Sequence, residues 1–503
     1  MTDHGVAVPE RAGSGLEGPR AKEYAAVEPV PIEDRNIGPG DMFATWVGAN
    51  ANNGTWYVGG VVAAACFVPS LYVTALANPV AYIVMALVGL IGFRAGVSTM
   101  AITRFAFGIR GSLLPSLLNT TQFIGWTAVN TFIAAISVSF VLKELLGWPA
   151  YGEPGSDATM LAGIVVMSAL HLVSIAAGHN SVKIVERVGV ALVVLLAAWE
   201  TAVVFQQVSL SQIVAWRPPP DKALPFGAAM DIMAAFSLGW VPAIAEFTRY
   251  CKTKTSATWV PMLGANVGLF WFALTGTVVT IGAAVATGSY DPNNSDPSAV
   301  VSKLGLGMVA FLVIIITSTT ANAINLMAAG ISLTNMTAKM KALPALWAVT
   351  AVAAAVTAVP LYTGGFLHAF ILFLEYIGMV FGPVFAIVIA DYYLVNRGRY
   401  DVAAIDRRDG RYWFCGGVNR RAAAVWAAGV TVFLLLREAP LCVETTGATF
   451  PAMALTGALY YLAAGGRQEH HPSAGEQVLD EQPGGEQEAE EGVGLGGGHH
   501  SGH

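Results

Sequence analysis

Charged residues are scarce in this chain of 503 residues: Lys, Arg, Asp and Glu supply only 12%, whereas hydrophobic residues supply 55%. A soluble protein carries roughly 25% charged residues, so this scarcity excludes an ordinary soluble protein. The deficit lies in the middle of the chain, because residues 1–41 and 466–503 are polar. Between them, apolar stretches near the ~20 residues that cross a bilayer follow one another. This pattern indicates a membrane protein with many spanning helices.

Motifs of enzymes and of ATP-driven pumps are also missing. The four cysteines show no CxxC spacing, which argues against a zinc site and against a disulfide framework. The sequence contains no P-loop, no nucleophile elbow and no convergent His, Asp or Cys cluster in an apolar stretch. We therefore predict that the protein is not an enzyme and needs no cofactor. The polar start lacks the apolar core of a cleavable signal peptide, so we expect the first membrane helix to direct insertion.

The apolar stretches predict an all-α fold of about twelve transmembrane helices. Most of the 27 Lys and Arg residues fall in the loops after even-numbered helices. The positive-inside rule then predicts that both termini lie in the cytoplasm. We expect the chain to cross the inner or plasma membrane of the cell. The predicted parts are a disordered cytoplasmic tail over 1–41, helices 1–5 over 42–207, helices 6–10 over 208–395, a cytoplasmic loop with helices 11–12 over 396–465, and a disordered tail rich in acidic residues, Gly and His over 466–503.

Two of the apolar stretches contain residues that interrupt a helix. The first carries three asparagines between Gly48 and Gly54, and the sixth carries a break from Gly239 to Pro242. Hydrocarbon cannot satisfy exposed amides or carbonyls, so both breaks are predicted to face a cavity inside the protein. Broken helices at matching places in two halves of a chain are typical of a secondary transporter. We predict two inverted five-helix repeats of the LeuT type, with helices 1 and 6 broken.

The third predicted helix carries Gln122, Trp126 and Asn130 at positions i, i+4 and i+8, which share one helical face. An indole between two amides suits a flat heteroaromatic solute, because the ring stacks and the amides bind its edge. In the sixth helix, Phe236 or Trp240 would close the other side of this pocket. The alternative is that these aromatic residues pack in the core and the amides hold helices together.

The eighth predicted helix contains four consecutive hydroxyl residues, Thr317 to Thr320, followed by Asn322 and Asn325. Sodium takes hard oxygen ligands, which hydroxyls and the carbonyls of an unwound helix supply. The alternative is that each hydroxyl bonds back to a carbonyl of its own helix, as is common in membranes. Four hydroxyls in a row exceed what this alternative predicts, so the run favours a binding site.

Several of these stretches resemble the nucleobase–cation symporter-1 family. This family comprises purine and cytosine permeases with hydantoin, allantoin, uracil and thiamine-precursor relatives. The resemblance covers roughly residues 30–465, and its most specific parts are the loop from Arg104 to Pro115 and the segment from Asp391 to Tyr400. The other matching pieces are Gly48 to Gly60, Gly125-Trp126, Gly239-Trp240, Glu246 to Tyr250 and Ser318 to Thr320.

The resemblance implies a role for individual residues. Trp126 sits where the family stacks its substrate, and Gln122, Asn130 and Asn325 sit at amide positions that recognise it. The usual stacking position in the sixth helix falls on Ser237, so Phe236 or Trp240 would have to substitute. For the cation, the resemblance implies the carbonyls of Gly48, Ala51 and Ile316 with the hydroxyls of Thr319 and Thr320.

These observations predict a symporter that imports a nucleobase (cytosine or a purine) or a related flat heterocycle together with Na+ or H+, by alternating access. The expected partners are this small molecule, a monovalent cation and the lipid bilayer, with no nucleic acid, and the chain is expected to act as a monomer. One alternative is a LeuT-fold transporter of another solute, such as an amino acid, a thiamine precursor, hydantoin or allantoin. A membrane-embedded enzyme or a channel is less favoured.

Overall fold

The computed structural model describes residues 24–176, 179–336 and 342–465, and it leaves the side chains of 175–187 and of part of 320–345 undescribed. The predicted tails therefore lie largely outside the described residues. Within the described residues the chain is helical, and seven helices are long and apolar enough to cross a membrane. Two shorter apolar helical stretches, Gly307–Thr319 and Leu346–Leu361, add to these.

The first predicted span consists of two helices, α1 (Pro39–Asn50) and α2 (Asn53–Val62). Between them Ala51 leaves helical geometry and Asn52 is extended. The Asn52 side chain accepts from the Thr55 amide at 3.0 Å and so caps α2, as asparagine does well at a helix start. Asn50 donates to the Trp46 carbonyl and accepts from the Tyr82 hydroxyl at 2.7 Å. The side-chain amides of Asn50 and Asn52 thus form hydrogen bonds within the protein.

The interruption in the sixth predicted span is milder. Helix α9 (Phe226–Leu238) passes through a 3₁₀ turn at Val241–Ala243 into α10 (Ile244–Thr248). Gly239 and Trp240 keep right-handed helical angles, so the axis tightens there instead of becoming extended. Pro242 explains the tightening, because proline has no amide hydrogen for the α-helical bond.

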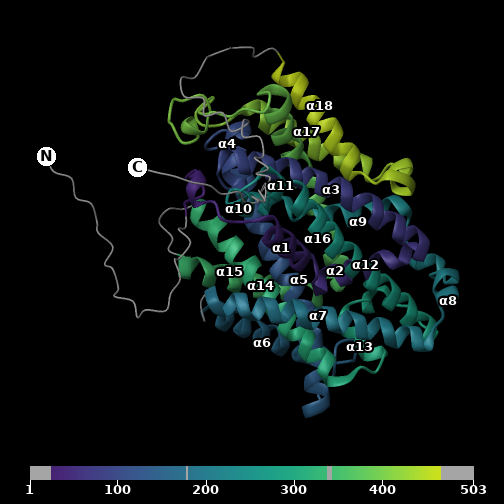
Figure 1. The fold of residues 1–503 in the computed structure, drawn as a ribbon. Coiled ribbons are helices and arrows are strands. Elements are labelled where there is room, and N and C mark those ends of the chain that lie inside the picture. Colours follow the sequence, from purple (N-terminus) through teal and green to yellow (C-terminus); the bar gives the residue numbers. More distant parts are fainter. Residues whose placement is uncertain (1–23, 177–178, 337–341, 466–503) are drawn as a thin grey trace, which may run out of the picture. The chain divides into compact units, whose positions relative to one another are not determined.

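The remaining helices complete the bundle. They are α3 (Phe67–Ala95), α4 (Thr99–Phe107), α5 (Leu113–Leu146), α6 (Ser156–Ala176), α7 (His179–Gln207), α8 (Leu210–Ala215), α11 (Lys254–Ala257), α12 (Trp259–Thr287), α13 (Pro297–Lys303), α14 (Gly307–Met336), α15 (Ala342–Ala358), α16 (Phe366–Ile389), α17 (Arg420–Leu436) and α18 (Thr449–Ala464). The most extensive contacts join α5 to α14 and α12 to both α1 and α2. Figure 1 shows α1, α2, α5 and α16 in the middle of the bundle and α17 and α18 together at one edge.

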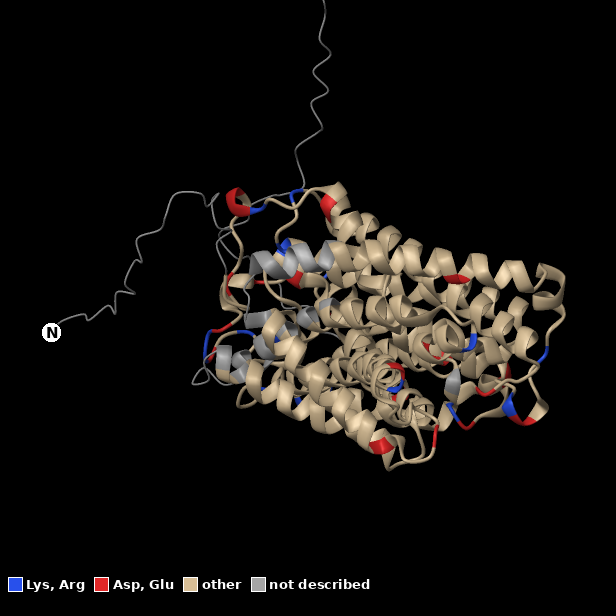
Figure 2. Cartoon of the chain, turned by 90° about the horizontal axis from the view of Figure 1, so that it is seen from below, with Lys and Arg blue, Asp and Glu red and all other residues tan. Residues whose placement is uncertain are grey.

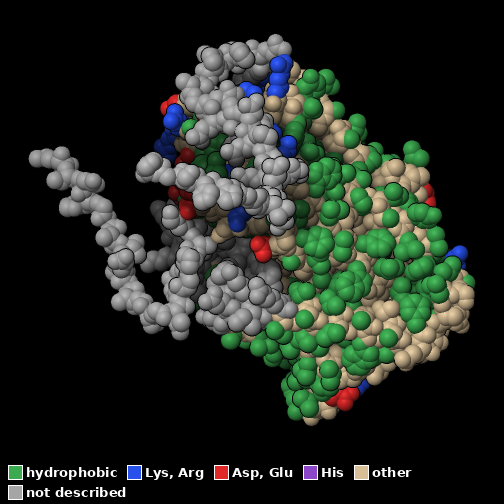
Figure 3. All heavy atoms as spheres, viewed as in Figure 1, with side chains coloured by type: hydrophobic (Ala, Val, Ile, Leu, Met, Phe, Trp, Pro, Cys, Tyr) green, Lys and Arg blue, Asp and Glu red, His purple; other side chains and the backbone are tan. Residues whose placement is uncertain are grey.

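The described surface has the composition of a lipid-facing protein. Large apolar side chains point outward from several helices, including Val165, Leu195 and Val309, which are 68%, 65% and 64% exposed. Figure 3 shows a broad hydrophobic face with few charged side chains. In Figure 2 the Lys, Arg, Asp and Glu residues lie mostly towards the two ends of the helical body. An exposed apolar surface of this extent marks contact with a membrane or with another protein.

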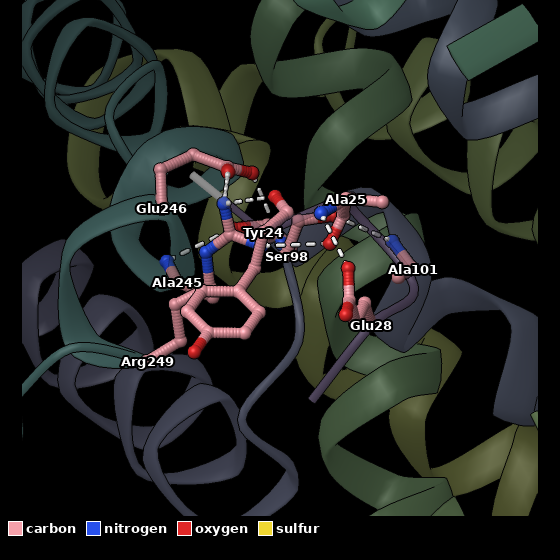
Figure 4. Close-up of polar contacts among 9 residues, drawn as sticks. Tyr24, Ala25, Glu28, Ser98, Ala101, Ala245, Glu246 and Arg249 are labelled. Carbon is pink, nitrogen blue, oxygen red and sulfur yellow. Dashed lines mark hydrogen bonds and ion pairs between the residues drawn. The ribbon is translucent and has the colours of Figure 1, made fainter. Parts of the chain in front are cut away.

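The structure differs from the predicted tail boundary at residue 41, because residues 24–38 pack against the helices. Val30 is only 2% exposed, and the Ser98 amide donates to the Ala26 carbonyl. Figure 4 shows the Arg249 guanidinium, beside Glu246, donating to the carbonyls of Tyr24 and Ala25 at 3.3 and 3.1 Å. These are mostly backbone contacts, so the polar composition of the segment gave no sign of them.

Helices α2 and α12 approach so closely that glycine is required between them. A Cβ on Gly276 would lie 1.9 Å from the Trp56 carbonyl oxygen, far inside a real contact distance. Gly276→Ala is therefore expected to destabilise the protein, since overpacking in a close-packed interior typically costs about 1–3 kcal/mol. The measurement is the midpoint of thermal unfolding of the purified protein in detergent.

The matched control for this substitution is Gly40→Ala. A Cβ on Gly40, in α1, would meet no atom within 4 Å, and alanine favours a helix by roughly 1 kcal/mol over glycine. An unfolding midpoint that falls equally in both variants would contradict the close approach of α2 and α12.

Candidate binding site

A cavity opens where the break between α1 and α2 faces α5, α7, α9 and α14. It encloses about 740 Å³, including the part that is open to solvent. Its lining residues are Gly48, Ala49, Ala51, Asn52 and Gly54 at the break, Phe123, Trp126 and Asn130 on α5, Gly189, Val190 and Val193 on α7, Phe236, Gly239 and Trp240 around the end of α9, and Thr317, Ala321 and Asn325 on α14. None of these side chains is ionisable, so the cavity offers apolar surface and neutral hydrogen-bonding groups.

The structure brings together Trp126, Asn130, Phe236, Trp240 and Asn325, all of which line this cavity. These five were predicted from the sequence as substrate-binding residues. They come from three helices, so their meeting could not follow from helical spacing alone. The other two predicted residues of this set lie behind the cavity wall.

The Trp126 indole is held in place by edge-to-face contacts. Its ring centroid lies 5.1 Å from that of Phe236 and 5.0 Å from that of Phe373, with interplanar angles of 79° and 80°. Gly239 packs against the same ring, because a Cβ there would lie 3.2 Å from the indole Nε1. Aromatic pairs in this geometry stabilise one another by about 0.5–1.5 kcal/mol beyond area burial. The indole is thus a fixed planar wall.

Asn130 presents an unpaired acceptor at the cavity. Its Nδ2 donates to the Trp126 carbonyl at 3.2 Å, whereas its buried Oδ1 accepts no hydrogen bond from the described residues. An unsatisfied buried oxygen costs about 1–3 kcal/mol, and a ligand N–H would remove that cost. Asn325, on α14, also lines the cavity and donates to the Asn322 Oδ1 at 3.3 Å, which leaves its own Oδ1 as a second acceptor.

Gln122 and Asn322 tie helices together behind the cavity. The Gln122 Nε2 donates to the Gly239 carbonyl at 2.8 Å and so holds α5 to the end of α9. The Asn322 Nδ2 donates to the Thr127 carbonyl and the Thr131 hydroxyl, both at 3.0 Å. Both side chains are fully buried. In this conformation each serves the packing alternative described for the amides.

The residues implied for the cation are only partly gathered. Gly48 and Ala51 line the cavity, whereas Ile316, whose carbonyl is the implied ligand, is not among the lining residues. The Thr319 hydroxyl donates back to the Ile315 carbonyl at 2.8 Å. Thr319 also lies two residues, about 200° of helical rotation, from the lining residue Thr317. The side chain of Thr320 lies outside the described residues.

Sequence reasoning missed the partner of Asn53, the first residue of α2. Its Nδ2 donates to the Ile314 carbonyl at 3.2 Å, the Thr317 hydroxyl at 2.8 Å and the Ser318 hydroxyl at 3.0 Å, all on α14. An amide nitrogen has two hydrogens, so the three oxygens share them. The signal was present, since Asn53 belongs to the amide run at the break and Thr317 and Ser318 to the hydroxyl run. The sequence did not show that the two runs form hydrogen bonds with each other.

Cys251 lies outside the spans, in the turn between α10 and α11, and is buried. Burial raises the pKa of the Cys251 thiol to about 12, so this cysteine stays protonated and unreactive at neutral pH. Its sulfur lies 3.5 Å from the Ser256 carbonyl oxygen. Within the described residues no group of three or more His, Cys, Asp or Glu side chains is arranged to hold a metal ion.

Comparisons with known proteins place this site in context. The family model for permeases of cytosine/purines, uracil, thiamine and allantoin matches residues 29–462. A putative purine-cytosine permease of Bacillus subtilis (strain 168), YxlA, is 25% identical over 415 residues, which cover 79% of this chain and 84% of that protein. The allantoin permease of the same organism is 24% identical over 454 residues, 86% of this chain and 91% of that protein.

A cytosine permease of Escherichia coli (strain K12) is 26% identical over 332 residues, 65% of this chain and 70% of that protein. Among solved structures, Mhp1, a nucleobase-cation-symport-1 family transporter in a closed conformation with bromovinylhydantoin bound, matches with a TM-score of 0.70. That match has 20% identity and covers 88% of this chain and 96% of Mhp1, so it establishes a common fold. The chain therefore belongs to the family of permeases for cytosine/purines, uracil, thiamine and allantoin, and it is a multi-pass membrane transporter and not an enzyme.

Proposed function

We propose that this protein imports a nucleobase, cytosine or a purine, or a related flat heterocycle, together with Na+ or H+ by alternating access. The observation that carries the proposal is a cavity without ionisable side chains, with the Trp126 indole as a wall and the unpaired Oδ1 of Asn130 beside it. A flat neutral ring with an N–H edge fits these groups, because it stacks and donates at once. The names of the relatives, purine-cytosine, allantoin and cytosine permeases, support the same class.

The second stacking surface is assigned to Phe236 or Trp240. Ser237, at the usual position, is fully buried and donates to the Asn78 Oδ1 at 2.8 Å. It therefore faces away towards α3. Phe236 and Trp240 both line the cavity, on either side of Gly239. The proposed roles are stacking on Trp126 with one of these two rings opposite, and edge recognition by the amides of Asn130 and Asn325.

The proposed architecture is twelve helices in the inner or plasma membrane, with two inverted five-helix repeats and both termini in the cytoplasm. The break at Ala51–Asn52 and the tightening at Val241–Ala243 would begin the two repeats, and α17 and α18 would lie outside them. The transporter would act as a monomer that rocks around the cavity. The common fold with Mhp1 supports this arrangement.

The amino-acid alternative would have to bind a charged solute without a charged side chain, so the carboxylate would depend on a nest of backbone amides at the break. An amino acid carries a carboxylate and an ammonium group, and burying an ion without a partner is very costly. Among the described lining residues none offers a counter-charge. Allantoin, hydantoin and a thiamine precursor stay within the proposed class, since all three are heterocycles.

The coupling ion is left as Na+ or H+ in this proposal. Gly48 and Ala51 would contribute carbonyls to a sodium ion, with Ile316, Thr319 and Thr320 supplying the rest by resemblance. Oxygens are the ligands that such hard ions prefer. Each ligand would stabilise the other's site, with a coupling of about 1–3 kcal/mol typical of linked sites.

The test is a thermal-shift screen of the detergent-purified protein against cytosine, purines, uracil, allantoin and hydantoin, each with and without NaCl against a choline chloride control. A ligand that binds only the folded protein raises the free energy of unfolding, by about 2.7 kcal/mol at a hundredfold excess over Kd, and so raises the unfolding midpoint. We expect a shift with at least one of these rings. No shift with any flat heterocycle, together with a shift with an amino acid, would contradict the proposal.

A further inference from the structure

A buried carboxyl group joins α7 to the broken span next to the cavity. Glu200, on α7, is 1% exposed. Its Oε2 accepts from the Trp56 indole Nε1 of α2 at 2.9 Å, and its Oε1 has no hydrogen-bond partner among the described residues. Apolar side chains surround this pair, including Ala197 and Val204 on α7 and Phe272 on α12. The carboxyl group thus has one neutral donor and a free oxygen.

The helices that pack against α7 supply no charge to compensate an ionised Glu200. Helices α12 and α14 contain no titratable residue along their whole lengths. The titratable residues on the other elements around this cluster are Asp157 and His171 on α6, Tyr57 on α2, Cys66 before α3, Tyr72, Tyr82 and Arg94 on α3, and Lys303 on α13. Asp157, Tyr72 and Lys303 are exposed. His171 lies against Asn322, Tyr82 donates to Asn50 and Arg94 donates to Tyr392. None of these residues bonds Glu200. Within the described residues, an ionised Glu200 would have no counter-ion.

The other buried or half-buried carboxyl groups of the described spans are satisfied. Asp231 accepts from the amides of Ala448 and Thr449. Glu246 pairs with Arg249 and accepts from the Thr99 amide. Glu375 pairs with Arg437. Asp391 accepts from the hydroxyls of Tyr400 and Tyr460 and from the Asn396 amide. Glu200 differs from all of them, so a structural role like theirs does not account for it.

Glu200 is also placed to sense the conformation of the transporter. It lies seven residues beyond Val193, which lines the cavity, on the same face of α7 and about 10 Å further along the helix axis. Its partner Trp56 follows two residues after Gly54, which also lines the cavity. A movement of α2 relative to α7 would therefore open or close the contact at the carboxyl group. That movement would accompany alternating access at the break.

We propose that Glu200 binds the proton that this transporter carries with its substrate. This inference rests on the proposed import of a heterocycle, and it adds the identity of the ion and its site. In the conformation open to the outside, water reaches the Glu200 carboxylate, and one of its oxygens takes a proton from that water. The neutral acid is then buried against Trp56 while the cavity holds the substrate. In the proposed topology Glu200 lies on the outer side of the cavity, so on opening to the inside water reaches the acid through the emptied cavity, and the acid returns its proton to that water. One proton moves per cycle, and nothing else is gained or lost. Because an unpaired buried carboxylate is costly, the unprotonated carrier resists closure, which prevents leakage without the ion.

A second buried acid, Asp296, lies in the loop before α13 and is the rival site. Burial raises the pKa of Asp296 to about 6. It caps α13 by accepting from the Ala299 amide at 3.0 Å, and the charge of Lys303 acts on it. Asp296 thus has a helix N-terminus and a cation to stabilise its charge, which Glu200 does not.

The experiment uses the full chain in proteoliposomes, with radiolabelled cytosine and allantoin as probes. An imposed gradient of one pH unit can drive about tenfold accumulation at one proton per substrate. We expect such accumulation by the wild type without sodium, and we expect Glu200→Gln to bring the internal and external concentrations to equality. The glutamine keeps an oxygen for Trp56 and cannot titrate. Substrate exchange under equal pH on both sides reports that the variant still folds and binds.

Two further variants separate this site from other carboxyl groups. Glu375→Gln, in another span and paired with Arg437, should leave pH-driven accumulation unchanged, and Asp296→Asn tests the rival. Full accumulation by Glu200→Gln, or loss in Asp296→Asn alone, would overturn the inference and leave the proposed function standing. The same holds if the wild type accumulates substrate only under a sodium gradient. If the wild type exchanges none of the probes and shows no thermal shift with any heterocycle, the proposed function itself fails.

A second measurement needs no variant. Downhill entry of unlabelled cytosine or allantoin into vesicles that contain a trapped pH indicator should acidify the lumen, by one proton per substrate. Entry without acidification would overturn the inference even if Glu200→Gln cannot be purified.

Discussion

Trp126→Ala is expected to lower the affinity for a heterocyclic substrate by about 5- to 150-fold, since stacking of a base on an aromatic side chain is worth about 1–3 kcal/mol. The indole lines the cavity and is fixed by Phe236, Phe373 and Gly239. Alanine removes the planar wall and also frees Phe236, a proposed second stacking ring. The measurement is the Kd of the ligand found in the thermal-shift screen, determined by calorimetry in detergent.

The matched control is Trp271→Ala on α12. Trp271 is 41% exposed and lies outside the cavity lining, so its removal should leave the Kd unchanged. The unfolding midpoint of Trp126→Ala without ligand shows whether the protein remains folded. A folded Trp126→Ala variant with wild-type affinity would remove Trp126 from the site and with it the central element of the proposed recognition.

Local sequence is sufficient to explain why the structure separates α1 from α2. Glycines and amides between Gly48 and Gly54 disfavour a helix wherever they occur, and asparagine caps the helix that follows. Both effects act within a few residues, so no tertiary information is needed. The same reasoning overestimated the second break, because Pro242 can be accommodated by a 3₁₀ turn when the flanking residues keep helical angles.

Helical spacing also predicted which residues of α5 lie on one face of the helix, but not what each side chain would contact. Gln122 and Asn130 are eight residues apart and drift by about 80° on the helix. That drift leaves Asn130 at the cavity and turns Gln122 to the carbonyl of Gly239. The partner depends on where α9 ends, which the sequence of α5 does not contain.

Pairings between distant segments were beyond sequence reasoning. Trp56 and Glu200 are 144 positions apart, and Asn53 and Thr317 are 264 apart. Each residue taken singly has a common structural explanation, such as core packing for Trp56 or a helix start for Asn53. Only the packing of α2 against α7 and α14 reveals that a carboxyl group lacks a counter-ion and that one amide joins three oxygens.

Asn53→Ala is expected to reduce the stability of the protein by about 1–3 kcal/mol, since it removes a buried amide that donates to three oxygens. These bonds join the break to α14. The hydroxyl of Thr317 still donates to the Ile314 carbonyl at 3.1 Å, so the loss falls on the link between the helices. The measurement is the unfolding midpoint followed by tryptophan fluorescence.

Asn266→Ala is the control, because among the described residues the Asn266 amide donates only to the Met262 carbonyl of its own helix, at 2.8 Å. Its removal should shift the midpoint far less. The comparison isolates the link between α2 and α14 from the general cost of deleting an asparagine in a membrane helix. If α2 must move against α14 during transport, Asn53→Ala should also change the rate of substrate exchange, whereas Asn266→Ala should not. Equal midpoints for the two variants would show that the hydrogen bonds between α2 and α14 add nothing to stability, and the position of α14 would then be held by its packing against α5 and α7.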